Sequence, residues 1–320
     1  MSASGGTKAI IAALLANAGI AVAKFAGFLI TGSSSMLAEA VHSVADTSNQ
    51  GLLLLGGKRA QRAATAEHPF GYGRDRYFYS FVVALLLFSL GSVFALYEGI
   101  HKLSSHEPLT SPLVAVIILV VAIVLEGFSF RTAIGESRGL KGDSTWWQFI
   151  RQAKAPELPV VLLEDFGALI GLVLALFGVG LTVLTGNSVF DALGTISIGL
   201  LLGVIAVILI IEMKSLLIGE GATQPVLRRI VSELECCDPV ERVIHIRTQY
   251  LGPDELLVAA KIALVPMIRI EEVARAIDAA EQRVRGAVPE ARLIYLEPDL
   301  DRSGSASDPS KVAQPVDPGA

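Results

Sequence analysis

Six apolar runs, each close to the length that a helix needs to cross a lipid bilayer, constrain how this 320-residue chain can fold. A transmembrane helix needs about 20 mostly apolar residues, because the hydrocarbon core of a bilayer is about 30 Å thick. Backbone groups in lipid must pair with one another, so such runs fold as helices. The sequence therefore predicts a polytopic α-helical membrane protein with six spans, which are Ala9–Ile30, Met36–Gly57, Phe78–Ile100, Pro112 to about Phe130, Leu158–Leu184 and Ala192–Ile211.

The composition agrees with a membrane protein and argues against one class of partner. Hydrophobic residues make up 52% of the chain and charged residues 18%, which is too apolar for an average soluble domain. The formal net charge of −5 provides no basic surface for nucleic acid. We therefore expect the lipid bilayer, and no nucleic acid, among the partners of this protein.

The positions of the lysines and arginines predict how the spans are oriented. The loops after the second and fourth spans are rich in cations, whereas the loops on the opposite side hold only Lys102. Because positive loops stay in the cytoplasm, both termini are predicted to be cytoplasmic. We expect an integral protein of the plasma (inner) membrane. Lys24, inside the first span, is expected to extend its ammonium to the far interface.

After Lys214 the pattern changes from membrane spans to a small folded domain. Residue spacing predicts a helix at 224–234, strands at 240–250 and 256–264, a helix at 270–284 and a last strand at 293–296. This α-β-β-α-β order predicts a cytoplasmic α+β domain. The predicted organisation is a short N-terminal tail (1–7), a six-helix transmembrane domain (8–213), the α+β domain (214–301) and a disordered tail (302–320).

His42 and Asp46 lie four residues apart in the second span and therefore share one face of the helix. An imidazole beside a carboxylate is half of a site for a borderline cation such as Zn²⁺. An aspartate at the centre of a membrane helix costs about 3 kcal/mol, so a partner, a cation or a proton is expected to offset it. The alternative is that the two side chains only bond to each other across the helical turn. We favour a metal site.

Glu164 and Asp165 bring carboxylates to a similar depth from the fifth span. Asp46 lies ~15 Å from the outer surface and Asp165 ~10 Å from the cytoplasmic one at 1.5 Å per residue, so both lie near the midplane. Adjacent helical residues point about 100° apart. We therefore expect His42, Asp46 and Asp165 to bind the metal, and Glu164 to support a ligand or accept a proton. Zn²⁺ is the expected ion, with Mn²⁺, Fe²⁺ or Co²⁺ as alternatives.

Motifs that follow one another along the chain resemble the cation diffusion facilitator (zinc transporter) family. The second span reads Gly-Ser-Ser-Ser-Met-Leu-Ala-Glu-Ala-Val-His-Ser-Val-Ala-Asp at 32–46, and the next loop reads His-Pro-Phe-Gly-Tyr-Gly-Arg at 68–74. Tyr-Glu-Gly-Ile at 97–100 and Leu-Glu-Asp at 163–165 are similar to the zinc-transporter-nine branch. The resemblance covers nearly the whole chain. It implies a homodimer that exchanges cytoplasmic metal for protons, with a ferredoxin-like C-terminal domain.

One position departs from the family pattern. The family usually has His-xxx-Asp in the fifth span, and alignment on Asp165 and Gly171 puts Val161 at the histidine position. The identity of the fourth ligand is therefore open, with Glu164, Asn17 or water as the candidates. This departure puts the selectivity for zinc in question.

Other metal ligands are more weakly indicated. His68 either binds metal near its loop or caps the turn before Pro69. His245 lies where some relatives have a histidine that binds regulatory metal, although a lone histidine on a strand is more often structural. Cys236 and Cys237 are adjacent in the sequence and would add soft ligands, but a site there is the less favoured interpretation.

These features together predict proton-coupled efflux of a divalent cation, Zn²⁺ first, from the cytoplasm by alternating access around a midplane His/Asp site. Metal and protons compete for the same ligands, since metal binding needs them deprotonated. The alternative is a membrane protein that binds metal as a regulator or scaffold without transporting it. The sequence has no nucleophile motif or phosphate-binding glycine loop, so we do not expect an enzyme.

Overall fold

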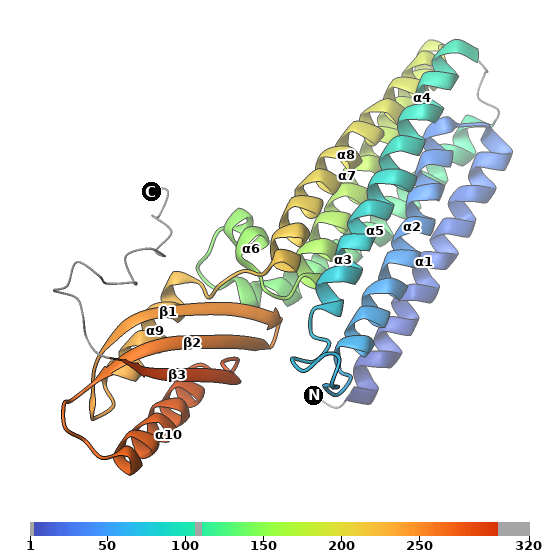
Figure 1. Cartoon of the computed structure of the whole chain (residues 1–320). Coiled ribbons are helices and arrows are strands. Elements are labelled where there is room, and N and C mark those ends of the chain that lie inside the picture. Colours follow the sequence, from blue (N-terminus) through green and yellow to red (C-terminus); the bar gives the residue numbers. More distant parts are fainter. Residues whose placement is uncertain (1–2, 106–110, 300–320) are drawn as a thin grey trace. The chain divides into compact units, whose positions relative to one another are not determined.

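The computed structural model describes residues 3–105 and 111–299 of the chain. It divides the chain into two compact units, Met1–Leu217 and Ile218–Ala320, which we treat separately (Figure 1). The predicted disordered tail at 302–320 lies outside the described residues.

Helices make up the first unit, and each predicted span lies in one helix or, for the third span, in three helices that continue one another. Among the described residues, four stretches are long and apolar enough to cross a membrane, namely 75–104, 113–139, 157–185 and 189–218. α1 contributes a shorter apolar stretch, and α2 is interrupted by polar residues. The elements are α1 (Ala3–Thr31), α2 (Ser34–Ala60), α3 (Asp75–Leu86), the π-helix η1 (Leu87–Val93), α4 (Phe94–Ser105), α5 (Pro112–Lys141), α6 (Trp146–Gln152), α7 (Glu157–Thr185) and α8 (Val189–Ile218).

Buried hydrogen bonds hold the turn between α1 and α2 against the first turn of α8. Ser33 Oγ donates to Asp191 Oδ1 at 2.8 Å, and the Ser34 backbone N–H donates to Asp191 Oδ2 at 3.0 Å. Lys102 Nζ, near the end of α4, donates to the Gly32 carbonyl oxygen at 2.8 Å. Buried polar groups are costly unless they are bonded in this way. The serines at 33–35 therefore fix where α2 begins.

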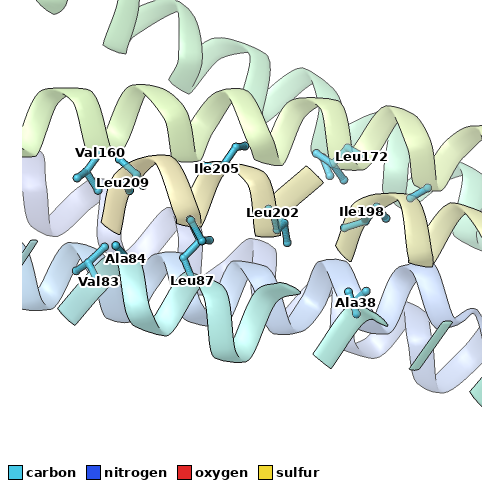
Figure 2. Packing of buried hydrophobic residues seen from close by; sticks show 14 of the residues in the cluster. Ala38, Val83, Ala84, Leu87, Val160, Leu172, Ile198, Leu202, Ile205 and Leu209 are labelled. Carbon is cyan, nitrogen blue, oxygen red and sulfur yellow. The ribbon is translucent and has the colours of Figure 1, made fainter. Parts of the chain in front are cut away.

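A continuous apolar core joins the helices of the first unit (Figure 2). Its side chains recur at helical spacing along α8, which places one face of that helix against α3, η1 and α7. The labelled members are Ala38 of α2, Val83 and Ala84 of α3, Leu87 of η1, Val160 and Leu172 of α7, and Ile198, Leu202, Ile205 and Leu209 of α8.

Gly199 of α8 packs against the backbone of Leu96 in α4. A Cβ at position 199 would lie 2.9 Å from the Leu96 backbone nitrogen, closer than real Cβ contacts come. Glycines at such crossings let membrane helices approach closely. We expect Gly199→Ala to lower the free energy of unfolding in detergent by about 1–3 kcal/mol, because the two helices must separate. Gly180→Ala is the control, since the described structure leaves open space within 4 Å there. Equal losses in the two variants would contradict this reading.

The second unit has the predicted α-β-β-α-β order. β1 and β2 pair antiparallel, β2 and β3 pair parallel, and the sheet order is β1-β2-β3. A parallel pair needs a crossover connection, which the second helix of the unit provides. The elements are α9 (Gln224–Glu235), β1 (Val240–Gly252), β2 (Glu255–Leu264), α10 (Ile270–Ala287) and β3 (Leu293–Asp299).

Side chains of β2 alternate between the core of the second unit and its other face. Leu256, Val258 and Ile262 are fully buried, as the period of two along a strand requires. β3 continues beyond its predicted end at residue 296, since its pairing with β2 extends to Asp299, opposite Ala263. Lys261 Nζ of β2 lies 2.9 Å from both Asp299 Oδ2 and Glu297 Oε1. These hydrogen bonds, that of Asp299 first, raise the pKa of Lys261 above its ordinary value.

Candidate metal centre

One face of α2 carries four polar side chains into the interior of the helical unit. Glu39, His42, Asp46 and Asn49 follow one another at spacings of three or four residues, so they form a stripe along the helix. Their exposed fractions are 0%, 0%, 8% and 0%. α2 is in contact with α1, α3, η1, α4 and α7. The stripe therefore faces other helices and not lipid, as functional polar groups in membrane proteins do.

His42 and Asp46 lie close together, but they do not satisfy each other's hydrogen-bonding atoms. His42 Nδ1 lies 3.5 Å from Asp46 Oδ1, which is long for a hydrogen bond. Among the described residues, neither ring nitrogen of His42 has a hydrogen-bond partner, and neither does Asp46 Oδ1. Leaving one buried polar atom unpaired costs about 1–3 kcal/mol. These are the atom types that a borderline divalent cation binds, so the pair has the composition of half of a metal site.

Glu164 and Asp165 of α7 point to different helices. Glu164 is 5% exposed and faces α2, where Asn49, one helical turn after Asp46, donates from its Nδ2 to Glu164 Oε1. Asp165 instead accepts a hydrogen bond from Ser129 Oγ of α5 at 3.1 Å. Because adjacent helical residues diverge by about 100°, both cannot face α2 at once. The structure therefore brings Glu164, and not Asp165, to the His42–Asp46 pair.

The stripe on α2 is not a closed metal site in this conformation. Within residues 3–105 and 111–299, no three side chains of His, Cys, Asp or Glu are grouped so that they could hold a metal ion. The arrangement is the His42–Asp46 pair with the Glu164 carboxylate as its neighbour. A movement of side chains or of α7 is needed before three ligands surround an ion.

Lys24 of α1 does not extend to the interface as the sequence suggests. Its side chain is 0% exposed, and its Nζ donates to Glu39 Oε2 at 3.1 Å. A buried carboxylate offers the ammonium a partner inside the protein, so the water of the interface is not required. Glu39 is a site residue that sequence reasoning misses. The signal that identifies it is an acidic residue three positions before His42 inside a membrane span.

The remaining predicted residues lie on different elements of the structure. Asn17 is half-buried on α1. His68 is exposed, with its ring centroid 4.6 Å from that of Tyr72. His245 is half-buried on β1, opposite Lys261 of β2. In the described part of the chain, neither histidine belongs to a group of three metal-ligating side chains.

The chain matches known membrane transporters over most of its length. The model of the cation efflux transmembrane domain matches residues 10–218. The proton-coupled zinc antiporter SLC30A9, mitochondrial, of Xenopus laevis is 38% identical over 248 residues, covering 77% of this chain and 44% of that protein. The protein of the same name from Mus musculus is 36% identical over 241 residues, covering 74% and 42%. Metal tolerance protein C4 of Arabidopsis thaliana is 29% identical over 257 residues, covering 80% and 56%.

The chain spans about half the length of these relatives. A solved structure named "MamM-CTD 215-293" matches 24% of this chain and 98% of its own at 23% identity, with a TM-score of 0.23 that is too low to support an argument.

The animal relatives are named mitochondrial, so the expectation of a plasma membrane gains no support from them. The transmembrane match shows an integral membrane protein from a family of transporters and not of enzymes. The chain therefore belongs to the cation efflux, or cation diffusion facilitator, family, in its zinc-transporter-nine-like branch.

Proposed function

We propose that this protein moves a divalent metal cation, Zn²⁺ first, out of the cytoplasm in exchange for protons. Membership of the family supports metal cation efflux, and the zinc antiporters among the relatives support zinc and proton coupling by analogy. The observation that carries the proposal is the group of buried atoms at His42 and Asp46 that have no hydrogen-bond partner among the described residues. A passing cation would supply the partner that these atoms lack in the empty carrier.

We propose His42 and Asp46 as two ligands and the acid pair of α7 as the source of a third. Glu164 already faces them, whereas Asp165 would have to leave Ser129 and turn about 100° around the axis of α7. The fourth position is left to Asn17 or to water. Because Val161 provides no second imidazole, the set is rich in carboxylates, which Mn²⁺, Fe²⁺ and Co²⁺ also accept.

Protons drive the proposed cycle because they compete with the metal for the same atoms. Metal binds from the cytoplasm to deprotonated ligands, the helices then open the site to the other side, and protons from that side displace the ion. The protonated carrier returns. A homodimer with cytoplasmic termini is part of the proposal, and the identity of the membrane, mitochondrial or plasma, is left to localisation of the tagged chain.

Liposomes that contain the purified chain and an internal zinc-sensitive dye test this proposal. An acidic lumen should speed zinc uptake over that at symmetric pH, because lumenal protons leave in exchange for zinc. An internal pH dye should record the lumen becoming more alkaline as zinc enters. Protein-free liposomes are the control for leakage.

Two results would redirect the proposal. Metal that binds in equilibrium dialysis but does not enter liposomes under any pH gradient would favour the non-transporting scaffold. Uptake that ignores the pH gradient would indicate a carrier or channel without proton coupling.

A further inference from the structure

The ammonium of Lys24 is enclosed by oxygen atoms from two neighbouring helices. Its Nζ lies 2.8 Å from Ser43 Oγ and 3.1 Å from Glu39 Oε2, both on α2, and 3.9 Å from Glu126 Oε1 on α5. Lys24 and Glu39 are 0% exposed, and Glu126 is 7% exposed. Charged side chains at such a position are rare and require partners. The partners of this ammonium are two carboxylates and a hydroxyl.

These three partners have the chemistry of a cation site. An ammonium is a compact point charge that is normally surrounded by water oxygens. Carboxylate and hydroxyl oxygens are also the ligands that hard divalent cations such as Mn²⁺, Mg²⁺ and Ca²⁺ prefer. Glu39 also keeps a free acceptor, since its Oε1 is buried without a hydrogen-bond partner among the described residues. Gly171 of α7 leaves room for that atom, because a Cβ there would lie 2.6 Å from it.

This oxygen-lined cage lies beside the candidate transport site. Glu39 lies three residues before His42, and Ser43 lies directly after His42. Both therefore lie within one helical turn of the imidazole. A divalent ion that reaches His42 and Asp46 is therefore close to a second group of oxygen ligands. Without Lys24, the second group would be free to compete for the ion. With oxygen ligands alone, it would favour hard cations more than the imidazole-containing site does.

We propose that Lys24 is a tethered cation that fills an all-oxygen site formed by Glu39, Ser43 and Glu126, and thereby confines the transported ion to the imidazole-containing site at His42 and Asp46. Lys24 is in this way a determinant of metal selectivity. The inference rests on the proposed function, which it extends from the ligands of the ion to the choice among ions.

Equilibrium dialysis of the purified chain against Mn²⁺ and against Zn²⁺ tests this. Lys24→Met removes the charge and keeps the apolar stem, so it should bind an additional Mn²⁺ ion per chain and shift the ratio of Mn²⁺ to Zn²⁺ affinity toward Mn²⁺ by at least about tenfold. The triple variant K24M/E39Q/E126Q is the matched control and should lose the additional ion. Lys24→Arg keeps a cation in the cage and should not gain it.

Each outcome decides the inference. If folded K24M binds no additional Mn²⁺, Lys24 is only a structural ion pair and the inference is wrong. If K24M is unstable, Mn²⁺ should raise its melting temperature more than Zn²⁺ does, because binding to the folded state stabilises it. Absence of that rescue, while the triple variant folds without metal, also overturns the inference. Failure of the proposed function is seen separately, as wild-type metal binding that Asp46→Ala leaves unchanged.

Discussion

Asp46→Asn is expected to lower the initial rate of zinc uptake into liposomes by about 100-fold. The substitution keeps the size of the side chain and removes the negative charge from a position that is 8% exposed. Interactions with a charged group contribute up to about 3 kcal/mol, and each ~1.4 kcal/mol is a factor of ten in affinity. Glu136→Gln, which removes an exposed acid from α5, is the control and should transport like the wild type.

The same assay decides between the two acids of α7. The structure places Glu164 beside Asp46 and Asp165 beside Ser129, so Glu164→Gln should reduce uptake by about 10-fold to 100-fold, and Asp165→Asn by less. The reverse order would show that α7 turns and that Asp165 is the ligand. Near-wild-type zinc uptake by a folded Asp46→Asn protein would show that Asp46 is not part of the transport site.

The sequence predicts the shared face of His42 and Asp46 because a spacing of four residues is enough to determine it. It cannot predict which of Glu164 and Asp165 faces α2, since that depends on how α7 is rotated about its own axis. The rotation is set by packing, as at Gly171, where the absence of a side chain admits the Glu39 carboxylate. Residues from distant parts of the sequence determine the rotation of α7, so no local sequence pattern predicts it.

The helical location of every predicted span follows from its apolar residues, and four of the described stretches are also long and apolar enough to cross a membrane. The π-helix Leu87–Val93 in the third span does not follow from the sequence in this way, because it has no distinct apolar pattern. Such a segment shifts the faces of the helix that follows it. Lys24 is a similar case. Its length allows either an interfacial or a buried position, and only the partner Glu39 on α2 decides between them.

The second large effect is expected at Asp191, whose carboxylate joins α8 to the start of α2. Asp191 is 0% exposed and accepts hydrogen bonds from Ser33 Oγ, from the Ser34 backbone N–H and from Ser34 Oγ. Asp191→Ala leaves these donors buried without their acceptor. We expect the free energy of unfolding in detergent to fall by about 3–5 kcal/mol, because each buried donor that loses its acceptor costs about 1–3 kcal/mol.

Denaturant titration in detergent measures the effect, with Asp143→Ala as the matched control because it makes the same chemical change at an exposed position. Asp191→Asn should fall between the two, since it keeps one oxygen acceptor and turns an NH₂ group toward the serine donors. Adding Ser33→Ala to Asp191→Ala should then lower the free energy of unfolding little further, because the two residues act as one unit. If Asp191→Ala and Asp143→Ala lose equal stability, the serines at 33–35 do not anchor α2. The depth of His42 and Asp46 in the membrane would then be set by the apolar core alone.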